Sequence, residues 1–356
     1  MKETKNKDTY KDNIERTTLA CFMAGDSISA SELYKTISQT HDTSLITIKR
    51  LLSKLTEAQT LIKTGKGRSV KYSISNTGRL YFQINPRVYC EDDVKKRISL
   101  ESFNFSLFES IPESIFSASH IHILDSTTKE YHVKNTDVSD TLHKKELERF
   151  IIELSWKSSQ IEGNTYTLLD TEKLIKDGIE AVGKTKDEAT MILNHKKAFD
   201  FIYQNRESFA DITVSKIETI HKILVEGLGI THDIRSKPVG ILGSRYRPLD
   251  NSFQIKEALL KLCEMVSRMK DGYSKALMII LGISYIQPFE DGNKRTSRLV
   301  GNAILLAHNL APLSYRIVDE EEYREAILVF YELNSLVPFR DIFFDQYIYS
   351  SKNYLI

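Results

Sequence analysis

The sequence predicts a mainly helical protein that begins with a small module of mixed helix and strand. After residue 140, apolar residues recur every three or four positions, which is the spacing of helices with one buried face. Residues 61–74 instead alternate polar and apolar side chains around a glycine-containing turn, as two short strands do. Charge divides the chain in the same way, since residues 1–90 hold 15 Lys and Arg against 8 Asp and Glu, and the remainder holds 34 against 40. A basic module and an acidic body are therefore expected.

The composition is that of a globular protein. With 356 residues, of which 41% are hydrophobic and 27% charged, the chain is long enough for several domains. It contains no apolar run of membrane-spanning length, and its start is polar. The widely spaced Cys21, Cys90 and Cys263 do not form a disulfide framework. We therefore expect a soluble, cytoplasmic protein with no membrane partner.

Residues 1–86 are predicted to form a winged helix-turn-helix domain that binds double-stranded DNA. Three helices are expected, the second capped by Ser29 or Ser31 and the third beginning near residues 42–44, and a strand pair follows. The candidate DNA contacts are polar residues of the third helix and of the turn: Ser44, Thr47, Arg50, Lys54, Lys66 and Arg68. The alternative is a small helical domain with a solvated basic face.

Residues 87–139 are interpreted as a linker with short strands. His120 and His122 alternate with apolar residues, so in a strand they would share one face, as metal ligands can. No third ligand follows at a metal-site spacing, and we therefore interpret both histidines as structural.

Residues 140–356 are predicted to form a helical domain with one hairpin, over 239–246. The helices are expected at 170–182, 186–205, 213–227, 254–270, 273–285, 294–309 and 320–334, after a first helix that ends near Gly163. Residues 178–185 fit the phosphate-loop pattern, but that motif requires a preceding strand, and the residues before it have helical spacing. We interpret Gly178 and Gly183 as helix ends.

The segment 285–298 is predicted to bind a triphosphate. Gly292 permits a tight turn, and the free N–H groups at the start of the following helix attract an anion. Arg295 and Arg298 lie three residues apart, on one helix face, and can hold phosphates together. Asp291 can bind a magnesium ion beside those phosphates. Two arginines at a helix start are unfavourable without an anion, which counts against a plain surface turn.

This segment resembles the core motif of the Fic (Fido) family, H-x-F-x-[DE]-G-N-[GK]-R-x-x-R. The resemblance covers roughly residues 140–350 and includes three further segments. Residues 158–165 resemble the inhibitory motif [ST]-x-x-x-E-[GN], residues 241–248 resemble the flap that positions the target, and 330–334 resemble the part of the fold that borders the adenine. The fold class implied is a Fic-type helical core with a small β-hairpin flap and an N-terminal inhibitory helix, preceded by the winged-helix domain.

The resemblance implies a role for each matching residue. Asp291 would bind the metal, and Phe289 would anchor the loop. Glu162, with Ser158 before it, would inhibit the protein by pairing with Arg298. The cofactors implied are ATP and Mg²⁺. The implied ATP contacts are Gly292, Asn293, Lys294, Arg295, Arg298 and Asn334. The implied flap residues, which position the target, are Leu242, Gly243 and Tyr246.

Two residues depart from the family pattern. Gln287 stands where the family has its catalytic histidine, and an amide has no basic site in the working pH range. Losing a general base typically costs ~10²–10⁴-fold in rate, although positioning and charge stabilisation still assist transfer. Lys294 stands where most AMP-transferring members have glycine. A lysine there is also found in the Doc branch, which transfers phosphate.

Two functions remain open at this point. In the first, the chain transfers AMP, or less readily phosphate, to a Ser, Thr or Tyr of a protein target, is autoinhibited by Glu162 and is weakened by Gln287. In the second, it is an ATP-sensing transcriptional regulator that binds DNA and has an impaired Fic core. A third, weaker reading is removal of AMP from a modified protein. The sequence names neither target nor operator, and it leaves the oligomeric state, a homodimer included, undecided.

Overall fold

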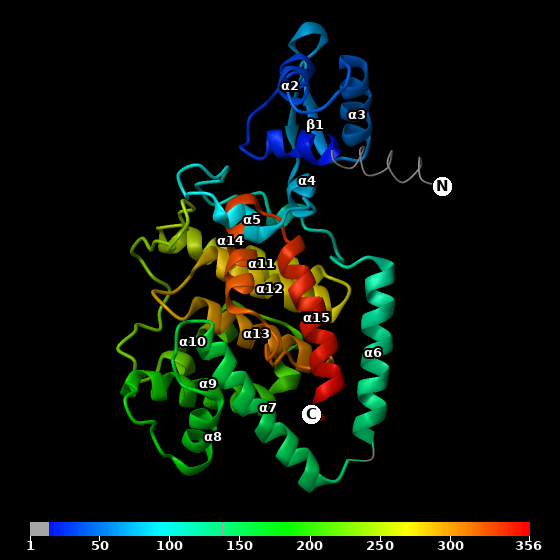
Figure 1. The fold of residues 1–356 in the computed structure, drawn as a ribbon. Helices are drawn as coiled ribbons and strands as arrows, with labels where there is room; N and C mark the ends of the chain where they lie inside the picture. Colours follow the sequence, from blue (N-terminus) through cyan, green and yellow to red (C-terminus); the bar gives the residue numbers. More distant parts are fainter. Residues whose placement is uncertain (1–13, 137) are drawn as a thin grey trace. The chain divides into compact units, whose positions relative to one another are not determined.

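The computed structural model describes residues 14–136 and 138–356, and its chain divides into two compact units (Figure 1). The first unit contains the chain up to Ser110 together with Ile241–Arg247 and Leu328–Pro338. The second contains Ile111–Gly240, Pro248–Ile327 and Phe339–Ile356. No helix within the described ranges is both long enough and apolar enough to cross a membrane.

The first unit begins with three helices and a strand pair, as the sequence predicts. Residues 14–22 are helical, and α2 (Ala30–Ile37) and α3 (Leu45–Glu57) follow. Ser29 caps α2 in a reciprocal capping box with Glu32, because each side chain binds the other's backbone N–H. Strands β1 (Leu61–Thr64) and β2 (Lys71–Ile74) pair antiparallel, with Leu61 opposite Ile74. Between them lies the short 3₁₀ helix η1 (Gly67–Ser69).

The core of the first unit is shared by segments far apart in sequence. Ile48, Leu52 and Leu55 of α3 are buried with Leu61, as the helical spacing predicts. The same cluster contains Val329 and Leu333 from the end of α14 (Glu320–Leu333). The remaining elements of this unit are α4 (Asn76–Leu80), α5 (Pro86–Glu91) and the 3₁₀ helix η2 (Phe108–Ser110).

The prediction of short strands within 87–139 was wrong, because α6 (Ala118–Thr136) is a helix of five turns. Its buried residues are Leu124, Thr127, Thr128 and Tyr131, which lie at helical spacing and include two threonines that hydropathy does not mark as core. His120 and His122 therefore point to different sides of a helix and do not share a face. The His120 ring lies 5.1 Å from that of Phe344.

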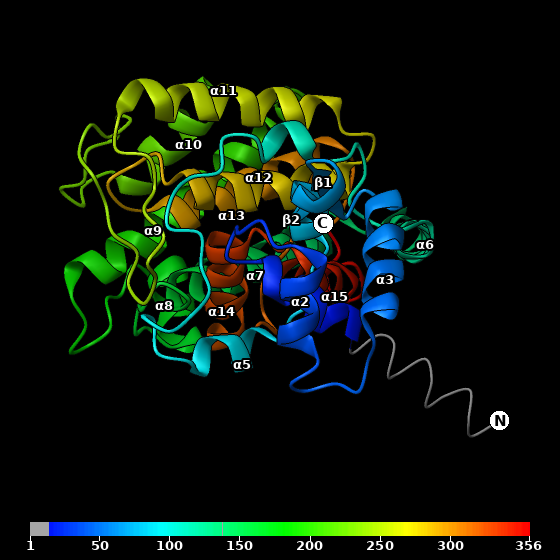
Figure 2. The same cartoon turned by 90° about the horizontal axis from the view of Figure 1, so that it is seen from above.

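The second unit is a bundle of helices around α12 and α13 (Figures 1 and 2). Gly301 of α13 and Gly282 of α12 allow close packing, since a Cβ on them would lie 2.6 Å from Ile280 Cγ1 and 2.3 Å from Leu262 Cδ1 respectively. The elements are α6, α7 (Asp140–Gln160), α8 (Leu168–Asp177), α9 (Lys186–Gln204), η3 (Arg206–Ala210), α10 (Val214–Val225), α11 (Ser252–Arg268), α12 (Gly272–Ile286), α13 (Asn293–Ala307) and α15 (Val337–Asn353). Gly178 ends α8, as predicted, so the phosphate-loop pattern follows a helix and not a strand. Gly183 does not end a helix, because α8 stops at Asp177 and not at 182, and Gly183 lies in the loop before Thr185, the cap of α9.

The predicted hairpin over 239–246 was wrong. Within the described residues, β1 and β2 form the one sheet, and residues 241–247 form a loop, hereafter the 241–247 loop. Gly243 adopts φ +76°, a left-handed backbone conformation in which the chain turns without paired strands on either side. The loop pairs at Arg247 through a single parallel bridge to Ser102. This contact to a distant segment replaces the predicted pairing between neighbouring residues.

Candidate functional site

The loop between α12 and α13 is shaped by Gly292 and Asn293. Gly292 adopts φ +74° and precedes the first residue of α13, so it acts as the helix cap without offering a side chain. The Asn293 amide binds both backbone groups of Phe289, at 2.9 Å to its N–H and 2.8 Å to its carbonyl. The first N–H groups of α13 are thereby presented at a preformed turn, which is the geometry of an anion site.

Phe289 anchors this loop in the interior. Its side chain is fully buried and stacks on the ring of His221 in α10, with centroids 3.6 Å apart and planes 5° from parallel. Burial lowers the pKa of His221 to about 4, so the ring is neutral at pH 7. His221 Nδ1 lies 3.1 Å from the Thr296 hydroxyl. Sequence reasoning missed His221, although its place on the buried face of a predicted helix could have drawn attention to it.

Arg295 and Arg298 are both buried, with side chains 2% and 0% exposed. Arg295 has one distant carboxylate partner, Asp291 at 3.6 Å, and its Nη1 has no hydrogen-bond partner among the described residues. Burial lowers the pKa of Arg295. A buried guanidinium with an unmatched donor favours a bound anion.

Glu162 neutralises the neighbouring cations. Its carboxylate forms an ion pair with Arg298 Nη1 at 2.9 Å and accepts a hydrogen bond from Lys294 Nζ at 2.9 Å. Burial alone would raise the pKa of this carboxyl, but Arg298 and Lys294 together lower it to about 2. The ring of Tyr323 lies 5.4 Å from the Arg298 guanidinium and adds a cation–π contact. The Glu162 carboxylate therefore pairs with Arg298, the residue that an external anion would otherwise contact.

Ser158 holds the other side of Arg298. Its hydroxyl oxygen accepts from Arg298 Nε at 2.9 Å, and its carbonyl accepts from Nη2 at 2.7 Å. The same hydroxyl lies 2.8 Å from Nε2 of His195, a fully buried residue of α9. Burial, together with the nearby Arg298 and Arg295, keeps the pKa of His195 well below its usual range. Because Arg298 can only donate, the Ser158 hydroxyl proton is available to the neutral ring. His195 was not predicted.

Gln287 closes α12 in a left-handed conformation with φ +51°. Its Oε1 accepts from Asn293 Nδ2 at 3.0 Å, and its Nε2 donates to the Ser284 carbonyl at 2.7 Å. Its own carbonyl accepts from Arg235 Nε at 2.6 Å. The side chain is therefore held in place from both ends of its amide, and it offers no basic nitrogen to a reaction.

Asp291 is the acidic residue of the turn, and its side chain is 68% exposed. One of its carboxylate oxygens accepts from the Gly292 N–H at 2.6 Å. Within the described parts of the chain, no group of three or more His, Cys, Asp or Glu side chains could hold a metal ion. A magnesium ion at this turn would therefore depend on Asp291 together with phosphate oxygens, which is a usual arrangement for this ion.

The other predicted site residues lie in the first unit. Asn334 is buried at φ +57°, and its Oδ1 accepts from Asn104 Nδ2 at 3.1 Å. In the 241–247 loop, Leu242 is 99% exposed, whereas Tyr246 is buried and stacks on Tyr331 at 5.7 Å. The six candidate DNA contacts are all exposed: Ser44, Thr47, Arg50, Lys54, Lys66 and Arg68.

Three of the six candidate DNA contacts already have partners. The Ser44 hydroxyl caps α3 by accepting from the Thr47 N–H at 3.2 Å, and it lies 3.0 Å from the Thr47 hydroxyl. Lys54 pairs with Glu15 at 3.0 Å. The exposed cations Arg50, Lys66 and Arg68 form no ion pair among the described residues, so a polyanion would contact them without displacing one.

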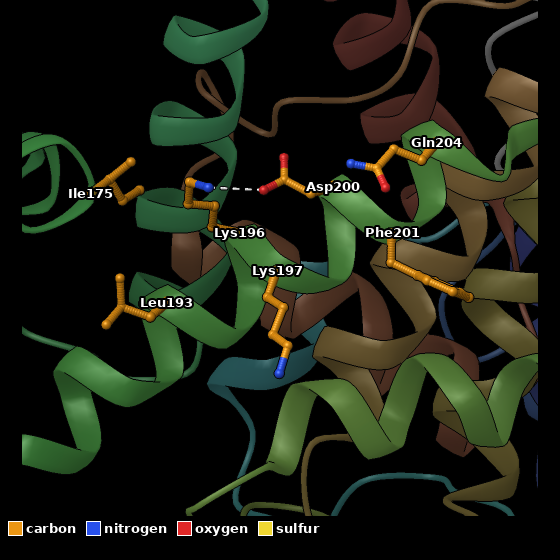
Figure 3. A pocket seen from close by; sticks show the side chains of 7 residues that line it. All are labelled: Ile175, Leu193, Lys196, Lys197, Asp200, Phe201 and Gln204. Atoms are coloured by element: carbon orange, nitrogen blue, oxygen red, sulfur yellow. Dashed lines mark hydrogen bonds and ion pairs between the residues drawn. The ribbon is translucent and has the colours of Figure 1, made fainter.

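The second unit also has a surface hollow of about 500 Å³ (Figure 3). It is formed by Ile175, Leu193, Lys196, Lys197, Asp200, Phe201 and Gln204, of which Lys196 and Asp200 form an ion pair at 2.8 Å. None of the predicted site residues lines it. We therefore do not assign the chemistry of the α13 turn to this hollow.

The chain is similar to proteins of the Fic/DOC family. The family model matches residues 211–305, which include α10, α11, α12 and most of α13. Protein adenylyltransferase Fic of Nematostella vectensis is 29% identical over 180 residues, covering 48% of this chain and 41% of that protein. Protein adenylyltransferase fic-1 of Caenorhabditis elegans is 23% identical over 184 residues, covering 50% and 36%. The chain thus spans about two fifths of the length of these relatives.

Solved structures show the same fold. Fic-1 from C. elegans superposes with a TM-score of 0.56 at 20% identity, covering 67% of this chain and 70% of that one. A Fic family protein from Desulfovibrio desulfuricans G20 gives a TM-score of 0.55 at 20% identity, covering 68% and 75%. At these identities the likeness establishes the Fic fold alone.

Proposed function

We propose that this chain binds ATP with Mg²⁺ at the amino-terminal end of α13 and transfers AMP to a Ser, Thr or Tyr hydroxyl of a target protein. The observation that carries the proposal is the pair of buried arginines, Arg295 and Arg298, beside a preformed helix start. The Fic/DOC family model covers both arginines, and relatives named protein adenylyltransferase match about half of the chain. Phosphate transfer is the less favoured outcome of the same site.

The residues present fit a magnesium triphosphate. Gly292 and the first N–H groups of α13 would receive phosphate oxygens, and a Cβ at Gly292 would lie 3.4 Å from both the His221 ring and Val225. Arg295 would use its unmatched Nη1, and Asp291 is exposed enough to bind the metal ion. When bound, the metal ion would neutralise charge on the phosphates, while these residues orient them.

Glu162 would act as an inhibitory latch on this site. Its carboxylate takes Arg298 and Lys294, the two cations that a terminal phosphate would otherwise engage. Opening the latch costs the contacts of a buried ion pair and leaves a buried carboxylate to be rehydrated. The resting protein would therefore bind ATP weakly or in an unproductive position, and loss of Glu162 would strengthen binding.

Gln287 would limit the reaction that follows. Its amide can orient a hydroxyl or a phosphate oxygen but cannot take the proton of the attacking hydroxyl. The buried arginines and the helix start remain to stabilise charge on the transferred group. We therefore expect slow transfer with the nucleotide seat intact.

Two measurements test this function. Calorimetry with ATP and Mg²⁺ should detect binding that strengthens at least tenfold in Glu162→Gly, with Glu148→Gly on the exposed side of α7 as the matched control. Incubation with α-labelled and γ-labelled ATP should then label protein from the α position. Label from the γ position alone would assign phosphate transfer, and absence of heat in both variants would sink the proposal.

The second candidate is a DNA-binding regulator with an ATP-sensing core. The excess of 15 Lys and Arg over 8 Asp and Glu in residues 1–90 and the exposure of Arg50, Lys66 and Arg68 favour it. The full chain should bind duplex DNA at low salt, and Arg50→Ala with Arg68→Ala should reduce both the affinity and its salt dependence. Unchanged binding in this double variant would reject the assigned surface.

A further inference from the structure

The 241–247 loop is built into the first unit, although the residues on either side of it, Gly240 and Pro248, belong to the second. Leu242 at its tip is 99% exposed, and the turn at Gly243 has φ +76°. Tyr246 points inward and is buried. The loop therefore has an outward tip and an anchored base, and the contacts of the base come from its own unit.

Glu332 is the central anchor of the loop. Its carboxylate is 1% exposed and lies near the end of α14. One oxygen accepts from the Ser244 hydroxyl at 2.6 Å and lies 3.4 Å from the guanidinium of Arg97. The other accepts from the Tyr89 hydroxyl at 2.6 Å, and the Glu332 carbonyl accepts from the Leu100 N–H at 2.7 Å. One acidic residue thus joins the loop to two parts of the 89–100 segment.

Arg97 completes the anchor. Its side chain is 2% exposed, lies 5.5 Å from the centre of the Tyr89 ring and donates to the carbonyl of Gly243. A buried ion pair adds little net stability, because desolvation offsets the attraction. The ion pair has a larger effect on the shape of the loop. If a partner of the Glu332 carboxylate moved away, a buried charge would be left without a hydrogen-bond partner, so each partner is kept in place.

A second line of contacts runs along the next residues. Arg245 forms an ion pair with Glu101, and the Arg247 N–H donates to the Glu101 carbonyl at 2.9 Å. Arg247 also pairs with Ser102 as a parallel bridge. The base of the loop is therefore fixed from Gly243 to Arg247, and the exposed tip is left to meet another molecule.

We propose that Glu332 and Arg97 are positioning residues that hold the 241–247 loop in the shape that receives the target protein. The loop would present the exposed side chain of Leu242 to that protein, and the contacts that shape the loop would thereby set target affinity. This inference rests on the proposed function, because it takes the loop to contact the hydroxyl-bearing target. It adds that the shape of the loop is decided by the 89–101 segment and the end of α14.

Hydrogen exchange on the full chain tests the anchor directly. Ser244→Ala removes one bond to Glu332 without leaving the ion pair broken, and it should speed exchange of the 241–247 amides several-fold. Glu332→Gln should speed it at least tenfold, while α12 and α13 keep their protection. Ser244→Thr, which keeps a hydroxyl group, should show the slow loop exchange of the unchanged protein. Glu322→Gln, on an exposed part of α14, should leave exchange of the loop amides unchanged. Unchanged loop exchange in Ser244→Ala and Glu332→Gln would overturn the proposal.

Kinetics test the link to the target. With dephosphorylated casein as the hydroxyl donor in the Glu162→Gly background, Ser244→Ala should raise KM for casein about tenfold and leave KM for ATP unchanged. A loosened loop with an unchanged KM for casein would also overturn the proposal. If calorimetry shows no ATP binding, the proposed function fails by itself, and hydrogen exchange still decides whether Glu332 anchors the loop.

Discussion

The charge of Glu162 and its position at the end of a helix together explain its contacts. It follows the last turn of α7, where a carboxylate is unfavourable beside the helix dipole, and two cations compensate it. Lys294 adds to the arginine contact, so the carboxylate is held from two directions. A side chain placed in this way should influence both stability and ligand affinity.

The first prediction concerns the pH dependence of Glu162. Its pKa is about 2 in the folded protein and near 4.5 when unfolded, so its stabilisation is present above pH 4.5 and is lost as the pH falls toward 2. Glu162→Gln should lower the free energy of unfolding at pH 7 by about 2–3 kcal/mol, and by less at pH 3. Urea unfolding at both pH values measures this, with Glu148→Gln as the control. An equal loss at pH 7 and pH 3 would contradict the assigned charge interaction.

The second prediction concerns Gln287. Histidine tolerates a left-handed backbone better than most residues, so Gln287→His should keep the turn at φ +51°. In the Glu162→Gly background it should increase the rate of labelling from α-labelled ATP by about 10²–10⁴-fold, because a general base is supplied. Gln287→Ala controls for loss of the amide. A histidine variant no faster than the alanine variant would show that proton transfer does not limit the reaction.

At the scale of elements, α12 and α13 place the candidate site because they pack closely. Gly301 excludes a side chain where α13 meets Ile280 of α12, and Gly282 does so where α12 meets Leu262 of α11, so that the turn from Gln287 to Gly292 follows a closely packed helix and precedes another. The loop sequence gives the turn its shape, and the contact between the helices keeps that shape in place.

The third prediction follows from this packing. Gly301→Val should lower the free energy of unfolding by about 1–3 kcal/mol, because even its Cβ would lie 2.6 Å from Ile280 Cγ1 and force the helices apart. Gly240→Ala, where a Cβ would meet nothing within 4 Å, should change it by less than about 0.5 kcal/mol. Chemical denaturation compares the two. Equal stabilities would refute the close packing.

At the scale of the whole molecule, neither compact unit is a continuous stretch of chain. The end of α14 supplies Leu333 to the core of the first unit, and the same unit contains the 241–247 loop. An N-terminal fragment of 85 residues would lack these packing partners, so DNA binding is better measured on the full chain. The arrangement also connects the basic module to residues near the end of the sequence.

The fourth prediction measures this connection. Leu333→Ala should reduce stability by about 2–4 kcal/mol, since the side chain is 1% exposed in the first core. Hydrogen exchange should accelerate in α3, more than 270 residues away in sequence, and less in α13. Val300→Ala, in the second unit, should show the opposite pattern. Acceleration confined to residues next to position 333 would contradict a shared core.

The sequence by itself determined most helices and the residues of the anion turn, because these depend on local chemistry. Helical spacing, a serine cap at Ser29 or Ser31, and the succession of Gly292, Asn293 and two arginines all act within a few residues of chain. That Ser44, a candidate DNA contact, also caps α3 was not predicted. Gln287 could likewise be identified from its place in a motif, and its lack of a basic site follows from its amide alone.

Tertiary structure decided what depends on distant partners. The environments of His195 and His221 are set by contacts with Ser158 and Phe289, which lie far from them in the sequence, and α6 is identified by the residues that it buries. The sequence predicts a hairpin around Gly243, yet Glu332, Arg97 and Glu101 hold the 241–247 loop instead. A glycine indicates where the chain turns, but the partners of the residues beside it are decided by segments far away in the sequence.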